Sequence, residues 1–184
     1  MGQDGGVGEA VQSLGRRRGQ RIRDDRFDHR AGSPAQRRSA QKNGGDEAIG
    51  RSRGGLSTKI HALVDALGNP LAFLLTPGQA HDLEGADALL PGMEADVLLA
   101  DKAFDADQRV IEPLQAAGKT AVIPPKSSRT SRRSYDEDLY EARHLIENFF
   151  CRIKQFRAIA TRYDKRAINF LAGVYLAATL VWLN

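Results

Sequence analysis

The sequence predicts an α/β domain built on a mixed sheet. From Leu56 onwards, segments with strand character alternate with segments of helical periodicity, the pattern of a sheet covered by helices. The run Asp96–Ala100 (DVLLA) is short and apolar after its first residue, as expected for a strand buried on both faces. Leu56–Ala66 and Leu71–Thr76 flank a Leu-Gly-Asn-Pro turn and predict an antiparallel hairpin.

The first 49 residues differ from the rest of the chain. Residues 1–55 hold twelve of the eighteen glycines, and the first fifty residues include only seven large apolar ones. Such a segment buries too little apolar surface to offset the chain entropy lost on folding. We therefore expect residues 1–49 to be disordered or loosely attached and residues 50–184 to form the folded domain. The basic run Arg16–Arg18 leaves open an arm that contacts DNA.

The middle of the chain predicts two helices and two strands, ended by proline and glycine residues. In order, these are a helix over Leu83–Leu90, the buried strand Asp96–Ala100, a helix over Ala106–Ala117 and a strand over Thr120–Ile123. A polar, basic loop, Lys126–Ser134, follows them.

Tyr135–Phe156 is predicted to be one long amphipathic helix. Its apolar residues recur at alternating spacings of three and four, the period of a helix face packed on a core. Tyr140, Arg143, Glu147 and Lys154 form a second stripe, centred about 120° from the apolar one. This stripe places a carboxylate between two cations. It suits either one wall of an acidic metal site or a solvated face with ordinary ion pairs.

Composition narrows the class of protein. The net charge of +4 permits a nucleic-acid partner without requiring one. A single cysteine, Cys151, forms neither an internal disulfide nor a zinc cage, so a reduced cytoplasmic setting is expected. No signal peptide is visible, and the apolar run Phe170–Leu183 is shorter than the roughly 20 residues of a membrane span. We interpret it as a buried terminal helix and expect no membrane partner.

Two acids stand at positions suited to metal chemistry. Asp101 directly follows the buried strand, and ligands of open α/β sheets bind beyond the carboxyl ends of strands. Glu147 lies on a helix that can pack across the same sheet. Paired carboxylates from distant chain positions are typical ligands of Mg²⁺, which prefers hard oxygen donors. The alternative is that Asp101 caps the next turn and Glu147 pairs with Arg143.

Four stretches of the chain resemble the catalytic domain of bacterial insertion-sequence transposases of the DDE class. They are Gly50–Pro70 (GRSRGGLSTKIHALVDALGNP), Val97–Asp105 (VLLADKAFD), Ala121–Arg129 (AVIPPKSSR) and Tyr135–Lys165. The last contains Tyr140, Arg143, Glu147 and Lys154 at the spacing of the family's Tyr-x-x-Arg-x-x-x-Glu-x-x-x-x-x-x-Lys signature. The resemblance spans about three quarters of the chain.

The resemblance implies a ribonuclease-H-like fold and metal-dependent cutting and joining of DNA. Asp101 and Glu147 would be the second and third metal-binding acids, with Mg²⁺ as the ion and Mn²⁺ as a substitute. Arg143 and Lys154, with Tyr140, would orient the glutamate or contact DNA. The implied partners are the element's terminal repeats and target DNA, bound by a homo-oligomer in the bacterial nucleoid.

The chain departs from the family in its first acid, which lies on the first, central strand in an Ile-Asp-Ser-Thr-like context. No such strand is predicted before Gly50, where Gln20–Arg30 reads QRIRDDRFDHR. One permissible coding of that peptide, shifted by one nucleotide, encodes Asn-Glu-Tyr-Ala-Met-Ile-Asp-Ser-Thr-Ile. Our hypothesis is that residues 1 to about 40 are an out-of-frame product, so that the domain lacks its first strand and is truncated. The alternatives are a non-catalytic DNA-binding remnant and a metal-dependent nuclease outside transposition.

Overall fold

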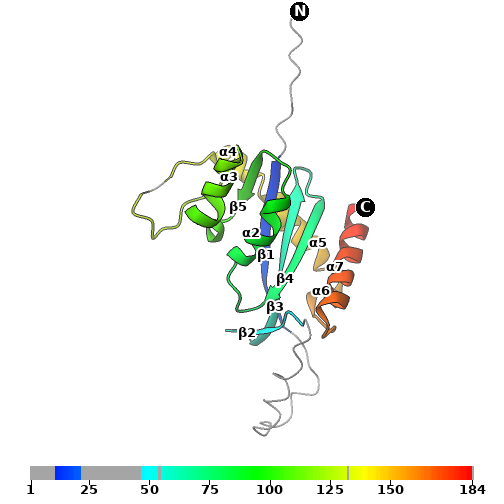
Figure 1. Ribbon diagram of the computed structural model, residues 1–184. Coiled ribbons are helices and arrows are strands. Elements are labelled where there is room, and N and C mark those ends of the chain that lie inside the picture. Colours follow the sequence, from blue (N-terminus) through cyan, green and yellow to red (C-terminus); the bar gives the residue numbers. More distant parts are fainter. Residues whose placement is uncertain (1–10, 22–46, 54, 132, 184) are drawn as a thin grey trace, which may run out of the picture. The chain divides into compact units, whose positions relative to one another are not determined.

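The protein is described by a computed structural model over residues 11–21, 47–53, 55–131 and 133–183 (Figure 1). Its six-stranded sheet has the order β2-β3-β1-β5-β6, with β4 paired to β3. The strands are β1 (Val11–Arg21), β2 (Gly50–Ser52), β3 (Gly55–Asp65), β4 (Pro70–Pro77), β5 (Val97–Ala100) and β6 (Thr120–Val122). β2 is antiparallel to β3, whereas β1 and β6 are both parallel to β5. The predicted α/β class with a mixed sheet is therefore confirmed.

Helices and helical turns connect the strands in the second half of the chain. They are α2 (Leu83–Leu89), the 3₁₀ turns η1 (Leu90–Gly92) and η2 (Lys102–Phe104), the π-helical turn η3 (Asp107–Ile111), α3 (Glu112–Ala116), α4 (Glu137–Glu141), α5 (His144–Ile153), α6 (Arg157–Ala160) and α7 (Ala167–Trp182). The boundaries predicted from Leu56 to Ile123 agree with these elements to within a few residues. The single helix predicted over Tyr135–Phe156 is wrong, because two separate helices, α4 and α5, occupy that range.

The largest difference from the sequence-based expectation is β1. The sequence predicts no strand in residues 11–21, yet they form a strand between β3 and β5. Leu14 is fully buried there, and Ser13 is 2% exposed. A central strand is hydrogen-bonded through its backbone on both sides. Strand β1 can therefore include the small residues Ser13 and Gly15 and lack the apolar alternation by which strands are predicted from sequence. The remainder of the 1–49 segment, apart from residues 47–49, lies outside the described residues.

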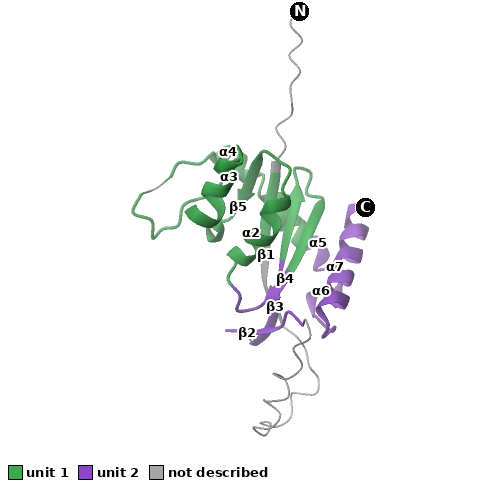
Figure 2. Cartoon of the chain, viewed as in Figure 1, with its two compact units in different colours: residues 1–16, 61–74, 81–150 green, residues 17–60, 75–80, 151–184 purple. Residues whose placement is uncertain are grey.

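The described residues fall into two compact units (Figure 2). The first unit contains the described residues within the ranges 1–16, 61–74 and 81–150. In this unit, α2, η3 and α3 pack on the face of β5 that carries Leu98 and Ala100. Residues 135–142, which include α4, pack on the opposite face, against Val97 and Leu99. Strand β5 is therefore covered on both sides, as its composition predicts.

The second unit takes in residues within 17–60, 75–80 and 151–184, and buries an arginine at its centre. Arg162 is fully buried and lies 4.8 Å from the centroid of the Phe170 ring. Its guanidinium also donates to the Thr58 hydroxyl. Its other hydrogen bonds go to backbone carbonyls, those of Glu47, Ala48, Asp164 and Lys165. The side chain thereby joins the segment before β2, strand β3 and the loop before α7.

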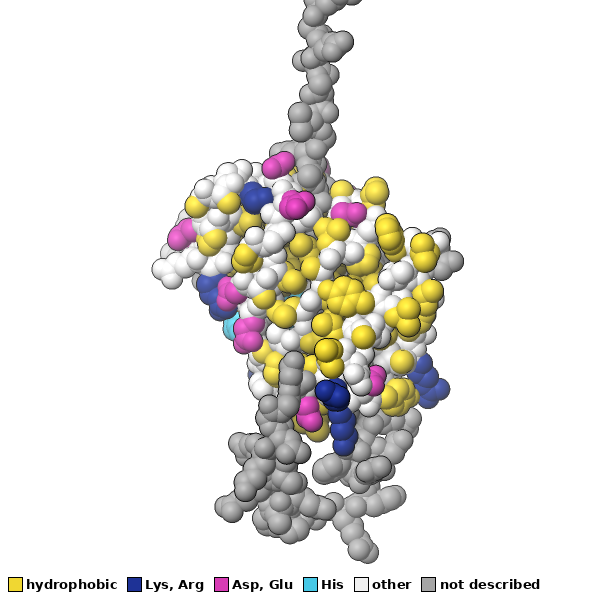
Figure 3. Space-filling model, turned by 45° about the vertical axis from the view of Figure 1, so that its right-hand side comes forward, with side chains coloured by type: hydrophobic (Ala, Val, Ile, Leu, Met, Phe, Trp, Pro, Cys, Tyr) yellow, Lys and Arg dark blue, Asp and Glu magenta, His cyan; other side chains and the backbone are white. Residues whose placement is uncertain are grey.

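Helix α7 buries one face in this second unit and exposes another. Its buried residues include Phe170 and Val174, whereas Leu176 and Trp182 are 64% and 63% exposed. Hydrophobic side chains gather over this helix in Figure 3. Among the described residues, no helix combines the length and apolarity that a membrane span requires.

We predict that Leu14→Ala lowers the free energy of unfolding by about 2–5 kcal/mol, because it leaves a cavity in the core beneath a central strand. Urea unfolding followed by circular dichroism measures the change. Leu67→Ala is the matched control, since Leu67 is 80% exposed and should shift the midpoint little. Equal, small effects of both substitutions would contradict the central position of β1.

Candidate active site

Asp101 lies where β5 leaves the core. The four residues of β5 are at most 1% exposed, whereas Asp101 is half-buried. Its Oδ1 atom accepts a hydrogen bond from the backbone N–H of Ala103 at 2.6 Å, which caps the turn η2. Phe104, at the end of that turn, is fully buried. Asp101 is thus fixed between the buried strand β5 and the buried ring of Phe104. Its Oδ1 atom caps the turn, which is the alternative role that the sequence suggests.

The face of the sheet that Asp101 joins follows from strand alternation. Successive side chains of a strand point to opposite faces, and the backbone of Asp101 is still extended. Asp101 therefore continues the face of Val97 and Leu99, against which Tyr140 packs. Burial raises the pKa of Tyr140, the charge of Arg143 opposes this, and the negative charge of Asp101 raises the pKa further. Arg143 therefore acts on the Tyr140 hydroxyl at close range, whereas Asp101 acts on it through space by its charge.

Glu147 is joined to the same neighbourhood through Arg143. The Arg143 Nη2 atom donates to Glu147 Oε1 at 2.5 Å, an i,i+4 pair. The guanidinium carbon lies 5.5 Å from the centroid of the Tyr140 ring, within range of a cation–π contact. The carboxylate remains 57% exposed. A continuous chain of contacts thus joins Tyr140, Arg143 and Glu147. We call these three residues, together with Asp101, the acid face.

A tightened turn separates α4 from α5 within this stretch. Four hydrogen bonds there reach back three residues instead of four, and their donors are the backbone N–H groups of Ala142, Arg143, Leu145 and Ile146. This is 3₁₀ geometry, which commonly ends or interrupts α-helices. Arg143 and Glu147 still meet across it, whereas Lys154 lies just beyond the end of α5 and is exposed.

Strand β1 places a glycine beside Asp101. The register of the two parallel strands pairs Leu14 with Ala100. Continuing it by one residue brings Gly15 opposite Asp101, just beyond the end of β5. Gly15 is buried, and a Cβ atom there would lie 2.7 Å from Cδ1 of Ile146 on α5. Contacts this short do not occur between real side chains. The residue opposite Asp101 in this continued register therefore carries no carboxylate, and a side chain there would require Ile146 to move.

The described residues do not complete a metal site. None of their His, Cys, Asp and Glu side chains form a group of three that could hold an ion. Asp65 does not supply a further acid, because it accepts from the backbone N–H groups of Leu67 and Asn69 and serves the hairpin turn. Asp24, Asp25 and Asp28 lie outside the described residues. The acid face offers two carboxylates, one fewer than the three acids that the family resemblance implies.

A second carboxylate after β5 was missed by the sequence analysis. The Asp105 side chain is fully buried and accepts from Arg129 Nε at 2.7 Å and from Arg133 Nη2 at 2.6 Å. The backbone N–H of Lys126 also donates to it, at 2.8 Å. Burial alone would raise the pKa of Asp105, but the hydrogen bonds from Lys126, Arg129 and Arg133 outweigh it, so the pKa lies below its usual value.

This cluster changes the interpretation of the basic loop Lys126–Ser134. Arg129 and Arg133 also both pair with Asp107, whose side chain is 47% exposed. Their charges are therefore balanced within the protein and are poorly placed to neutralise DNA phosphates. The signal in the sequence is the pair of acids Asp105 and Asp107, which equals the two arginines in number and is opposite to them in charge.

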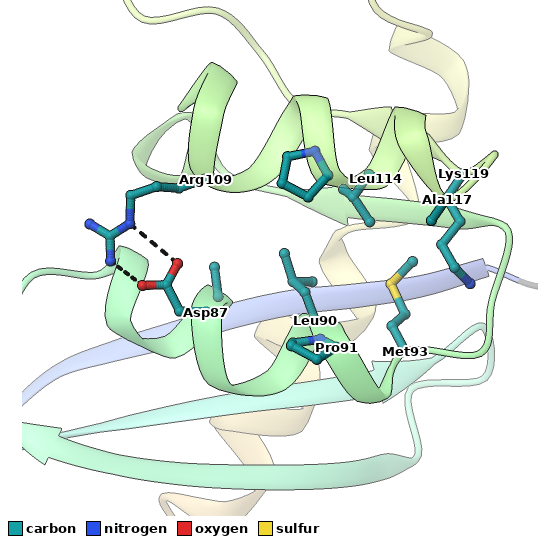
Figure 4. A pocket seen from close by; sticks show the side chains of 10 residues that line it. Asp87, Leu90, Pro91, Met93, Arg109, Leu114, Ala117 and Lys119 are labelled. Carbon is teal, nitrogen blue, oxygen red and sulfur yellow. Dashed lines mark hydrogen bonds and ion pairs between the residues drawn. The ribbon is translucent and has the colours of Figure 1, made fainter.

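A cavity of about 360 Å³ lies elsewhere in the first unit, between the α2–η1 segment and η3–α3 (Figure 4). Its buried lining residues, Ala86, Met93 and Leu114, belong to the same core cluster as Leu98 and Ala100. The ion pair between Asp87 and Arg109 stands at one end (Figure 4). The cavity therefore lies on the opposite side of β5 from Asp101 and is no part of the acid face.

Comparison with known proteins gives two findings. A profile of the family described as "Transposase DDE domain" matches residues 21–182. The chain is also 39% identical over 130 residues to a Brucella ovis protein whose name describes a transposase for insertion sequence element IS6501. That alignment covers 70% of this chain and 100% of the relative. No solved structure matches the chain.

We predict that Asp105→Asn lowers the free energy of unfolding at pH 7 by about 3 kcal/mol, because it leaves two arginines facing a neutral, buried amide. The pKa of Asp105 is lower in the folded than in the unfolded state. The stabilisation that Asp105 contributes is therefore present above its unfolded-state pKa of about 4. It is lost as the pH falls through its lower, folded-state pKa.

Urea unfolding between pH 7 and pH 2.5 measures both effects, and the variant should lose part of the acid dependence seen in the wild type. Asp87→Asn is the matched control, since it breaks an exposed ion pair and should shift the midpoint little. A variant as stable as the wild type at pH 7 would show that the cluster does not hold the loop.

Proposed function

The chain belongs to the family of transposases with a DDE domain, and from that premise we propose that it is the catalytic chain of an insertion-sequence transposase. The activity for which the fold is built is cleavage of DNA at the element's ends and joining of the new 3′-hydroxyl to target DNA. The mixed sheet flanked by helices is consistent with the ribonuclease-H-like fold expected of this family. DNA is the partner, and the bacterial cytoplasm and nucleoid are the setting.

On the acid face, Asp101 and Glu147 take the roles of the second and third acids. Support comes from their common neighbourhood, since Asp101 and Arg143 both act on the Tyr140 hydroxyl and Arg143 pairs with Glu147. Arg143 holds the glutamate in place, and Tyr140 supports the guanidinium. Lys154 is exposed beyond α5 and is proposed to contact a DNA phosphate. Transposases of this class act through a divalent metal ion, and Mg²⁺, with Mn²⁺ as a substitute, is the ion proposed for a complete site.

This copy is proposed to bind DNA but to cut it poorly. The single observation that supports this is Gly15 beside Asp101, with Ile146 filling the space where a side chain would lie. A face with two acids is proposed to hold a divalent ion more weakly than a face with three, because each carboxylate supplies hard oxygen ligands and negative charge. An active transposase and a nuclease outside transposition would each require a complete metal site. We therefore favour a DNA-binding remnant of a transposase over the nuclease.

The proposed origin of this defect is a change of reading frame within residues 1 to about 40. Residues 22–46 lie outside the described residues, and β1 is built from residues 11–21. The nucleotide sequence of the gene tests the idea. A shifted frame without an Asp-Ser-Thr-type strand would refute it.

We predict that the wild-type chain binds DNA in a salt-dependent manner but shows no more strand cleavage or joining than Asp101→Asn and Glu147→Gln. The assay uses DNA carrying the element's ends, with 5–10 mM Mg²⁺ or Mn²⁺ as an order of magnitude. Cleavage and joining that both variants abolish would overturn the proposed defect and establish the enzyme. Cleavage without joining would favour the nuclease.

We further predict that Gly15→Asp combined with Ile146→Ala raises the affinity for Mn²⁺ at least tenfold. The alanine removes the atoms that a Cβ at position 15 would meet, and the new carboxylate stands beside Asp101 on a neighbouring strand, about 5 Å away between Cα atoms. Isothermal titration calorimetry measures the affinity.

The matched control is Gly15→Asn with Ile146→Ala, which has nearly the same shape without the charge. Circular dichroism and urea unfolding establish that both double variants fold. Equal Mn²⁺ affinities of the two folded variants would show that position 15 does not face the acid site.

A further inference from the structure

The cavity between the α2–η1 segment and η3–α3 has the size of a small-molecule site. Its volume of about 360 Å³ lies at the lower end of the range for such sites, about 300–1,000 Å³. An apolar cavity of about 150 Å³ holds one benzene ring, so this cavity has room for two fused rings. All of its lining residues belong to the first compact unit. The cavity is therefore defined within one unit and suits a compact ligand.

The middle of the cavity is apolar. Its lining residues Ala86, Met93 and Leu114 are at most 5% exposed, and Leu90 packs against the same core cluster. Figure 4 shows Leu90 and Leu114 approaching the cavity from the two opposite helical segments. The unbranched side chain of Met93 can adapt to the outline of a ligand. An apolar ring system would fit here without taking any of these side chains' polar atoms out of water.

One end of the cavity is bounded by a balanced pair of charges. The Arg109 Nε atom donates to Asp87 Oδ1 at 3.2 Å, and Nη2 donates to Oδ2 of the same carboxylate. Such two-pronged pairing satisfies the planar fork of the guanidinium. The charges of Asp87 and Arg109 therefore compensate each other and leave little for a charged group of a ligand at this end.

Lys119 stands at the other end, beside Met93 (Figure 4). Its Nζ atom donates to the backbone carbonyls of Ala95 at 2.7 Å and Glu94 at 3.2 Å. An ammonium group has three N–H donors, so these two carbonyls leave one of them over. Within the described part of the chain, Lys119 takes part in no ion pair. One hydrogen-bond donor and one positive charge are thus available to a ligand at this end.

We propose that the cavity binds a small aromatic monocarboxylate, with its rings between the two helical segments and its carboxylate on Lys119. The charged lining residues are Asp87, Arg109 and Lys119, so a ligand with one negative charge makes the site neutral. The remaining N–H of Lys119 gives the carboxylate a charge-assisted hydrogen bond. The inference does not depend on metal binding or DNA cleavage, because the cavity and Asp101 lie on opposite sides of β5.

The test compares 2-naphthoate with its neutral analogue 2-naphthamide by isothermal titration calorimetry on the full chain at pH 7. Both have the two-ring body, and only the first is charged. 2-Naphthoate should bind one per chain with a dissociation constant of about 1 mM or lower. It should bind about tenfold more tightly than the amide, because only the carboxylate gains a hydrogen bond between two charged groups.

Two lysine variants test the role assigned to the charge. Lys119→Met keeps the length of the side chain and should abolish the preference for 2-naphthoate while leaving the affinity for 2-naphthamide unchanged. Lys102→Met is the matched control, because it changes the net charge equally but removes an exposed lysine outside the lining. It should keep the preference. Binding of the amide shows that the cavity of each variant is intact, and urea unfolding shows that the chain folds.

A second pair of variants tests the location. Ala117 is an exposed lining residue near Lys119, so Ala117→Trp should fill the ring space and weaken both ligands by about tenfold or more. The control Ala116→Trp lies one residue away and outside the lining, and should bind as the wild type does. The proposal is overturned by a folded wild type that does not bind 2-naphthoate, by equal affinities for the acid and the amide, by a preference that Lys119→Met retains, or by binding that Ala117→Trp leaves unchanged.

Discussion

Strand β5 has to bury every one of its side chains, because packed layers cover both of its faces. Val97 to Ala100 meet this constraint with exposures of at most 1%. Asp101 is consequently the first position along the strand at which a charge can be tolerated. The burial of Phe104, three residues after Asp101, anchors the turn η2 on the core. The position of the acid face is thus a consequence of core packing, and Tyr140, Arg143 and Glu147 are arranged around a point that the sheet has already fixed.

Charge is distributed in two different ways around this strand. Asp105 is buried, and its cost of burial is offset by three donors from one loop. Glu147 is paired with a single arginine and remains open to solvent. The first arrangement suits a fixed structural element, because it leaves no capacity for a ligand. The second leaves a carboxylate available, which is why the acid face, and not the basic loop, carries the proposed chemistry.

Much of the fold from Leu56 to Ile123 follows from local patterns in the sequence. The hairpin, the buried strand β5 and the position of Asp101 depend on apolar runs and turn residues that can be recognised without tertiary information. Strand β1 could not be predicted in this way. Its place depends on backbone pairing with β5 and on Ile146 filling the space above Gly15, both contacts between distant parts of the chain. The sequence also does not predict the 3₁₀ turn at Ala142 and Arg143, because the apolar residues on either side of the turn keep one unbroken helical spacing. The pairing of Asp105 with Arg129 and Arg133 likewise spans more than twenty residues.

The proposed loss of the first acid depends most on β1 lying at the centre of the sheet, because that position brings Gly15 beside Asp101. Hydrogen exchange of the backbone amides, followed by mass spectrometry, measures this directly. Amides of a central strand open only with large-scale unfolding. Peptides covering residues 11–15 should therefore be protected to the same degree as those covering β5. Exchange of residues 11–15 at the rate of an unstructured peptide, with β5 still protected, would contradict the account.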